Sequence, residues 1–369
     1  MIRLGLRPAR SAALVRRGAA SAALAVVAAI LPGCGSRDET TGIPEIRVGH
    51  FPNITHAQAL VGRAQGRFQN ALQGRARVAW RVFNAGPSAI EALLADSIDM
   101  TYIGPNPAIT GYVRSQGQAL RVIAGACSGG AALVVREDAG IDAPADFRKR
   151  SLATPQLGNT QDVAARHWLI DNGLNWVERG GTVRVLPLSN PDQLTLFLKK
   201  EIDAAWTVEP WVSRLVMEAG GRILLDEGSL WPGGRYVTTH LIASTAFLKK
   251  HPDLARDWIR EQIDVTRWIQ ENPDEARRVM NEQIRTDTGA ALGDALLSAA
   301  LKRLELTEDP LREALLTAGG RAFDLGFLGK EKPDLSGLHD LRFLEEARAA
   351  AGSGSGAAPA PAAPPRPAP

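Results

Sequence analysis

The fold of this chain is decided by one stretch, Thr154-Pro155-Gln156-Leu157-Gly158-Asn159-Thr160-Gln161-Asp162. Ahead of it, Ser151-Leu152-Ala153 is short and apolar, as at the end of a buried strand. Behind it, apolar side chains recur at helical spacing as far as Asn172-Gly173, a helix stop. A polar loop therefore joins a predicted strand to a predicted helix. Because the first N–H groups of a helix lack partners and its dipole is positive there, this loop is a candidate anion site. The alternative is that Asn159 or Thr160 only caps the helix.

The alternation of strands and helices continues on both sides of this loop. Strands are predicted at 46–51, 78–83, 98–103, 120–126, 131–136, 151–153, 183–186, 202–207, 222–225 and 236–243. Helices are predicted at 56–66, 90–95, after 107 and at 163–171, and then at 246–268, 273–285, 289–304 and 310–327. This order predicts an α/β chain with mainly parallel sheets.

A weak internal repeat divides this pattern into two similar lobes. Residues 87–107 align with 191–211 without a gap, and Ile98-Asp99 falls on Ile202-Asp203. The identities are few, so a chance match is the alternative, but the element order agrees in both copies. Ligands of open parallel sheets bind at the carboxyl ends of the strands. We therefore expect a cleft between the loops at 52–56, 86–88 and 104–107 of one lobe and those at 154–162, 189–192 and 208–211 of the other.

The N-terminal 33 residues read as an export signal. A basic region with five arginines and no acid, at residues 3–17, precedes a short apolar run at 19–31. Leu31-Pro32-Gly33-Cys34 then resembles a bacterial lipobox, which implies cleavage before Cys34 and a lipid on its thiol. An ordinary secretion signal with a chance cysteine is the alternative. Arg16-Arg17 raises twin-arginine export, but its flanking residues fit that signal poorly.

Charge and composition exclude several classes of function. The full chain has 43 Lys+Arg against 40 Asp+Glu, and without the leader 38 against 40 remain, a net charge of −2. This balance gives no support to a nucleic-acid surface. With Cys34 lipidated, Cys127 has no partner for an internal disulfide. We expect no cofactor, no metal and no catalysis, because the histidines form no metal-spaced cluster and no nucleotide or nucleophile-elbow motif is present.

The chain resembles the substrate-binding proteins of bacterial ABC importers for sulfonate, taurine and nitrate, and most of all the aliphatic-sulfonate group. The resemblance covers about 45–330. It is carried by Val48-Gly49-His50-Phe51-Pro52-Asn53-Ile54-Thr55-His56, by Asp99-Met100-Thr101-Tyr102-Ile103-Gly104-Pro105-Asn106-Pro107-Ala108, by 153–163, and by Ile202-Asp203-Ala204-Ala205-Trp206 with Glu209-Pro210-Trp211.

The resemblance implies the two-lobed periplasmic-binding-protein fold of type II, with parallel-rich sheets flanked by helices. We expect a lipoprotein signal at 1–33, a tether at 34–42, lobe 1 at 43–131 and 237–350, lobe 2 at 132–236, and a disordered Pro/Ala tail at 351–369. The crossings near 128–132 and 236–239 would form the hinge. The protein would be an exported monomer, anchored by its lipid and partnered by a permease with its ATPase.

The implied ligand is a small anion. A sulfonate stays ionised and presents only acceptor oxygens, so its site should offer neutral donors. The candidates of this kind in the cleft loops are Asn53, Thr55, Ser88, Asn106, Ser128, Gln156, Asn159, Thr160 and Gln161. These loops contain no lysine or arginine, which argues against phosphate-type dianions.

Four further candidates are ambiguous. His56 is either a donor or a capping residue, and Thr239 on the return strand either meets ligand or only suits the sheet. Glu209 is awkward in an anion site, so it either bonds within its lobe or meets a ligand amine, as taurine needs. Trp211 either walls the ligand's alkyl part or packs in the core.

Alternative functions stay open at this point. Within the receptor class, the ligand could instead be nitrate, an aromatic acid or a thiamine-precursor pyrimidine. From another class, an enzyme on the same scaffold remains, although the export leader argues against it. A lipoprotein that has lost transport and serves as a signalling or structural partner is the third alternative.

Overall fold

The computed structural model describes residues 42–354. The predicted signal, Cys34, the tether before Gly42 and the tail after Gly354 lie outside the described residues. The first residues of the predicted tail are helical, because α13 (Arg342–Gly354) extends to Gly354. Within 42–354, no helix is both long and apolar enough to cross a membrane.

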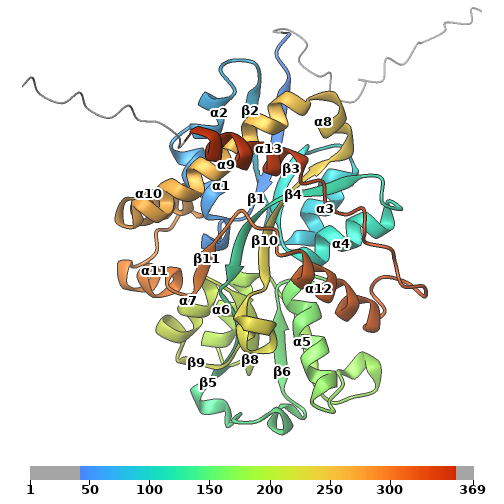
Figure 1. The fold of residues 1–369 in the computed structure, drawn as a ribbon. Coiled ribbons are helices and arrows are strands. Elements are labelled where there is room, and N and C mark those ends of the chain that lie inside the picture. The colour runs from blue at the N-terminus through green and yellow to red at the C-terminus, as the bar shows by residue number, and fades with distance from the viewer. Residues whose placement is uncertain (1–41, 355–369) are drawn as a thin grey trace, which may run out of the picture. The chain divides into compact units, whose positions relative to one another are not determined.

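The first lobe is built on a six-stranded mixed sheet in the order β11-β4-β10-β3-β1-β2 (upper half of Figure 1). β1 pairs in parallel with β2 and β3, while β10 runs antiparallel to β3 and β4, and β11 antiparallel to β4. Its strands are β1 (Glu45–His50), β2 (Arg77–Val82), β3 (Met100–Ile103), β4 (Leu120–Gly129), β10 (Val237–Ser244) and β11 (Leu304–Leu306).

The second lobe is built on a five-stranded mixed sheet in the order β7-β6-β8-β5-β9. β6 pairs in parallel with β7 and β8, and β5 runs antiparallel to β8 and β9. Its strands are β5 (Ala131–Arg136), β6 (Ser151–Thr154), β7 (Arg184–Pro187), β8 (Ala204–Val208) and β9 (Gly221–Asp226). The α/β class with two sheet-centred lobes is confirmed. Each sheet is mixed because a strand that links the lobes, β10 or β5, enters it in the opposite direction.

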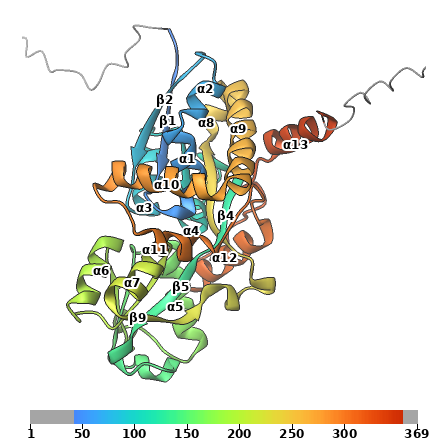
Figure 2. The same ribbon diagram turned by 90° about the vertical axis from the view of Figure 1, so that its left-hand side faces the viewer.

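Helices cover both faces of each sheet. In the first lobe, one core lies between the sheet and α1, α9 and α10, and another lies between the sheet and α3, α4 and α12. In the second lobe, α5 covers one face, while α6 and α7 cover the other (Figure 2). The helices are α1 (Ala57–Ala64), α2 (Arg67–Ala71), α3 (Gly86–Leu94), α4 (Pro105–Arg114), α5 (Thr160–Asp171), α6 (Asn190–Leu198), α7 (Trp211–Ala219), α8 (Thr245–Lys250), α9 (Pro252–Glu271), α10 (Pro273–Thr288), α11 (Asp294–Leu301), α12 (Arg312–Asp324) and α13.

The internal repeat is visible in the topology. β1-β2-α3-β3-α4 in the first lobe and β6-β7-α6-β8-α7 in the second follow the same order, and β3-β1-β2 matches β8-β6-β7 in the sheets. The aligned segments 87–107 and 191–211 therefore occupy equivalent places. In both lobes, the parallel strands end at the loops that were predicted to form the cleft.

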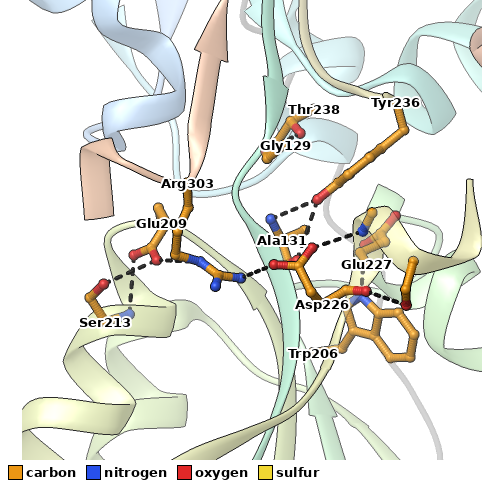
Figure 3. A network of polar contacts seen from close by, with 12 residues as sticks. Gly129, Ala131, Trp206, Glu209, Ser213, Asp226, Glu227, Tyr236, Thr238 and Arg303 are labelled. Carbon is orange, nitrogen blue, oxygen red and sulfur yellow. Dashed lines mark hydrogen bonds and ion pairs between the residues drawn. The ribbon is translucent and has the colours of Figure 1, made fainter. Parts of the chain in front are cut away.

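Within residues 42–354, two chain crossings join the two sheets. β4 passes into β5 through Gly129 and Gly130, and both have a positive φ. A Cβ on Gly130 would lie 2.2 Å from the Leu304 side chain, so only glycine fits there. β9 passes into β10 through residues 227–236. The Tyr236 hydroxyl binds the Ala131 main chain, which holds the crossings side by side (Figure 3).

Two predicted helices differ from the structure. The helix predicted at 246–268 is divided into α8 and α9 at His251, because Pro252 has no N–H to continue a helix but suits the first turn of a new one. The helix predicted at 289–304 ends at Leu301, and β11 follows it as an edge strand on β4. A strand of three residues carries too little periodicity to be separated from a helix end.

Candidate functional site

A cleft lies between the lobes at the carboxyl ends of their parallel strands. It encloses about 350 Å³ of free space, including the open solvent at its mouth. Every loop that was predicted to form the cleft contributes at least one lining residue, except the loop at 86–88. Residues 84 and 85, just ahead of that loop, line the cleft instead. The lining residues are Phe51, Asn53, Thr55, His56, Asn84, Ala85, Gly104, Pro155, Asn159, Thr160, Gln161, Asn190, Val208, Thr238 and Thr239.

The N-terminus of α5 forms the lobe-2 wall. The Asn159 side chain caps this helix and accepts a hydrogen bond from the Thr160 N–H at 2.7 Å. The loop ahead of it is held by the buried carboxylate of Asp162, which accepts from the Thr154 hydroxyl and the Gly158 N–H and pairs with Arg166. Asn159 therefore caps the helix, which was the alternative to an anion site. It also lines the cleft, together with Thr160.

Two buried hydroxyls in this cleft are unpaired. The Oγ1 atoms of Thr160 and Thr239 have no hydrogen-bond partner among the described residues, although these residues are only 6% and 1% exposed. A buried hydroxyl without a partner costs about 1–3 kcal/mol. Both threonines line the cleft, one from each lobe. They are therefore available to donate to a ligand oxygen.

The lobe-1 wall is formed by the turn after β1. Asn53 accepts a hydrogen bond at 3.0 Å from the indole N–H of Trp211, which comes from lobe 2, so this contact closes the cleft from one lobe to the other. His56 is buried, and burial, with His50 nearby as the lesser cause, holds its pKa well below the usual value. Its Nδ1 accepts from the Phe51 N–H at 3.4 Å, which leaves the proton of the neutral ring on Nε2. His56 is therefore a neutral donor at pH 7.

The lobes approach closely at Gly104. A Cβ built there would lie 2.4 Å from the Thr160 hydroxyl oxygen. Gly104 ends the turn between β3 and α4, and Thr160 opens α5. The absence of a side chain on Gly104 is therefore required for the lobes to meet in this arrangement.

The cleft carries no formal charge. None of the described residues that line it is Asp, Glu, Lys or Arg, and its histidine is neutral. Within 42–354, no group of three or more His, Cys, Asp and Glu side chains is placed to hold a metal ion. Hydroxyls, amides and a helix N-terminus can bind a monoanion without a full counter-charge.

Seven of the thirteen sequence-predicted residues line this cleft, and six lie elsewhere. Ser88 is exposed and donates to Gln156 Oε1 at 3.4 Å. Asn106 donates to the Ala318 carbonyl, and Ser128 accepts from the Tyr236 N–H at the crossing. The remaining two of the six are Glu209, whose buried carboxylate is bound by Ser213 and faces Arg303, and Trp211, which closes on Asn53.

Eight lining residues are not among the thirteen sequence-predicted ones, namely Phe51, Asn84, Ala85, Gly104, Pro155, Asn190, Val208 and Thr238, of which Thr238 was considered only as a weaker candidate on the return strand. The signal for Asn84 and Asn190 was present, because each follows the carboxyl end of a parallel strand, β2 or β7. Thr238 is polar, but its hydroxyl donates to the Gly129 carbonyl, and the remaining residues contribute main chain or apolar surface. A search for polar side chains does not find such residues.

A second cavity adjoins the cleft behind Thr160, which lines both. Its free space is about 290 Å³, again with open solvent included. Most of its walls are small and apolar, and the polar groups are Asn106, Glu227 and Arg321. The Glu227 carboxylate accepts from the indoles of Trp206 and Trp231, and burial raises its pKa to about 7. The Arg321 guanidinium lies over the Trp231 ring, 4.0 Å from its centre.

The two lobes, the paired crossings and the neutral cleft at the strand ends define the class of two-lobed solute-binding proteins. The chain belongs to the NMT1-like family, whose model matches residues 39–284. The family resemblance drawn from the sequence is thereby confirmed.

Named relatives agree with this assignment. The chain is 25% identical over 219 residues to the taurine-binding periplasmic protein of Escherichia coli (strain K12), a match that covers 58% of this chain and 64% of that protein. It is 24% identical over 334 residues to a Bacillus subtilis (strain 168) protein provisionally named as aliphatic sulfonates-binding, covering 88% and 95%. The solved alkanesulfonate-binding protein of Xanthomonas axonopodis pv. citri, bound to MOPS, has the same fold, with TM-score 0.66, 16% identity, and 79% and 97% coverage.

Proposed function

We propose that this protein is a non-enzymatic, extracytoplasmic receptor that captures a small organosulfonate and delivers it to an ABC permease. The observation that carries the proposal is the pair of unpartnered threonine hydroxyls, Thr160 Oγ1 and Thr239 Oγ1, in a cleft without formal charge. A sulfonate has three acceptor oxygens and no proton, so it satisfies both hydroxyls at once. The relatives named for taurine and aliphatic sulfonates support the same ligand class.

The charge of the cleft favours a monoanion. A phosphate-type dianion recruits guanidinium or ammonium groups, and the lining residues of the described chain include neither. A fully ionised acceptor group on a neutral, donor-rich wall is the best match to these residues.

The ligand's tail is proposed to lie in the adjoining cavity. The two spaces share Thr160, so a head group bound at its hydroxyl can extend a chain past Val163 and Ala164. Glu209 does not line either space, so it is not the partner of a ligand amine in this arrangement. The cavity is lined by small apolar residues together with Glu227, so both an alkyl tail and a tail that ends in an amine, as in taurine, are compatible with it.

Export, lipidation of Cys34, a monomeric state and a permease partner remain proposals. The relative named as a periplasmic protein and the leader at 1–33 support export. Lipidation is tested by the mobility of the expressed protein and by incorporation of labelled fatty acid, with Cys34→Ala as the control. If the protein, expressed in a bacterium, accumulated in the cytosol with its leader uncleaved, the export proposal would be overturned.

The experiment that tests the ligand is a thermal-shift and calorimetric screen of the purified protein. The compounds are methanesulfonate, butane-1-sulfonate, taurine, nitrate, sulfate and a pyrimidine. A ligand that binds only the folded state stabilises it by about 2.7 kcal/mol at a hundred times its Kd. A shift with alkanesulfonates is expected. A shift with nitrate or the pyrimidine alone would keep the receptor but reject this ligand class, and turnover of a bound compound would favour an enzyme.

A further inference from the structure

Arg303 joins the first lobe to two separate elements of the second. It lies between α11 and β11, and its main chain is fixed at the crossing, since Leu304 pairs with Gly129 in the sheet. The Arg303 carbonyl oxygen lies 2.7 Å from where a Cβ on Gly129 would be, so the two main chains are in close contact. From this fixed position, the Arg303 side chain extends into lobe 2 (Figure 3).

The guanidinium bridges two carboxylates of lobe 2. Its Nη2 atom lies 2.8 Å from Asp226 Oδ2 at the end of β9. Its Nε atom lies 3.0 Å from Glu209 Oε1 after β8, but the N–H is not aligned for a hydrogen bond, so this contact is an ion pair. Glu209 is fully buried, whereas Asp226 is half exposed. The bridge therefore compensates a buried charge at Glu209, whereas the Asp226 charge is also solvated by water.

The buried Glu209 carboxylate is stabilised by Ser213 and by this cation. Burial raises its pKa, and the opposing contributions come from the N–H and hydroxyl of Ser213 and from the charge of Arg303. Removing one member of a buried ion pair leaves the other charge buried without compensation. Without Arg303, the Glu209 segment is expected to move toward water.

Movement of Glu209 reaches the cleft through its neighbours in the chain. Glu209 is followed by Pro210 and Trp211, and Trp211 begins α7, whose Ser213 is bound by the Glu209 carboxylate. The Trp211 indole donates to Asn53, a cleft residue of the other lobe. One continuous set of contacts thus runs from Arg303 through Glu209 and Trp211 to Asn53.

We propose that Arg303 is a positioning residue for ligand binding, which holds the Glu209–Trp211 segment of lobe 2 so that Trp211 closes on Asn53. It touches no ligand itself. The inference rests on the proposed function only in taking the cleft as the ligand site. It assigns Glu209 a role in closure instead of contact with a ligand amine.

The test measures closure and affinity separately. The isotope-labelled indole N–H resonance of Trp211, assigned with Trp211→Phe, reports its hydrogen bond to Asn53 whether or not a sulfonate binds. Calorimetry with butane-1-sulfonate reports affinity. The variants are Arg303→Gln, Glu209→Gln, their combination, and Arg303→Lys. The matched control is Arg235→Gln, since Arg235 pairs with Glu305 near the same crossing but is exposed.

Arg303→Gln is expected to shift the Trp211 resonance and to weaken affinity about tenfold or more. The double variant, which removes both charges, should recover to within about threefold of wild type, because a neutral pair needs no compensation. Arg303→Lys should give an intermediate affinity, because lysine keeps the positive charge but lacks the planar guanidinium that contacts both carboxylates. The exposed control should change affinity less than about twofold.

The outcomes separate the two proposals. An unshifted Trp211 resonance in Arg303→Gln, or a double variant as weak as the single one, would overturn the positioning role. Wild-type protein that gives no heat with any sulfonate would overturn the proposed ligand, while the Trp211 resonance still decides the role of Arg303. If Arg303→Gln does not fold, Arg303→Lys and the double variant decide in the same way.

Discussion

Thr160→Val is expected to act in opposite directions on stability and on ligand binding. The Thr160 hydroxyl is buried without a partner among the described residues, so its removal takes nothing from the protein's own hydrogen bonds. Thr and Val have similar helix propensities, and Thr160 is at the first position of α5. The free energy of unfolding of the unliganded protein should stay unchanged or rise, by up to about 3 kcal/mol.

The affinity for an alkanesulfonate should fall sharply. A hydrogen bond to a charged acceptor is worth about 1.5–3 kcal/mol, which corresponds to a loss of about 10- to 150-fold. Urea denaturation gives the first quantity and calorimetry gives the second. Both are measured on the same preparation, so the two directions are compared directly.

Thr266→Val is the matched control. Thr266 is equally buried, but its hydroxyl donates to the Gln262 carbonyl at 2.8 Å and accepts from Gln58 at 3.2 Å, away from the cleft. This variant should lose about 1 kcal/mol of stability and keep its affinity. If instead Thr160→Val lost stability like the control and bound sulfonate normally, the reasoning from the unpaired hydroxyl would be refuted.

Three further predictions concern the walls of the cleft and the cavity beside it. Gly104→Ala should weaken ligand affinity about tenfold or more by keeping the lobes apart, because its Cβ would meet the Thr160 hydroxyl; calorimetry and X-ray scattering check this, and unchanged binding would contradict it. Asp162→Asn should cost about 3 kcal/mol in urea denaturation, because Arg166 then lacks its buried partner; a loss below 1 kcal/mol would contradict it. Burial raises the pKa of Glu227 to about 7, so the folded protein keeps this carboxyl protonated to a higher pH than the unfolded chain does. The free energy of unfolding should therefore fall by about 3 kcal/mol as pH rises from about 4.5 to 7. Glu227→Gln should remove this pH dependence when unfolding is measured across the same pH range.

The elements of the site were predictable because they depend on local pattern. The loop at 154–162 was expected between a strand and a helix, and β6 and α5 flank it. The expectation that both lobes offer strand ends to one cleft followed from the order of elements. The sequence did not predict as well which side chains of these loops line the cleft. The direction in which a side chain points from an irregular loop depends on contacts with residues distant in sequence. Ser88 and Gln156, for example, pair with each other outside the lining.

The sequence by itself determined the alternating strands and helices, the repeated topology and the donor-rich loops, because hydrophobic periodicity and turn residues act over a few positions. Only the tertiary structure decided which polar groups are satisfied within the protein. Trp211 meets Asn53 across 158 positions, and Arg303 compensates the charge of Glu209, a residue that sequence reasoning had offered to the ligand. The physical reason is that burial and charge compensation depend on which segments the crossings bring together. Among the described residues, two threonine hydroxyls of the cleft remain unpaired after those contacts are made, and the proposed ligand follows from them.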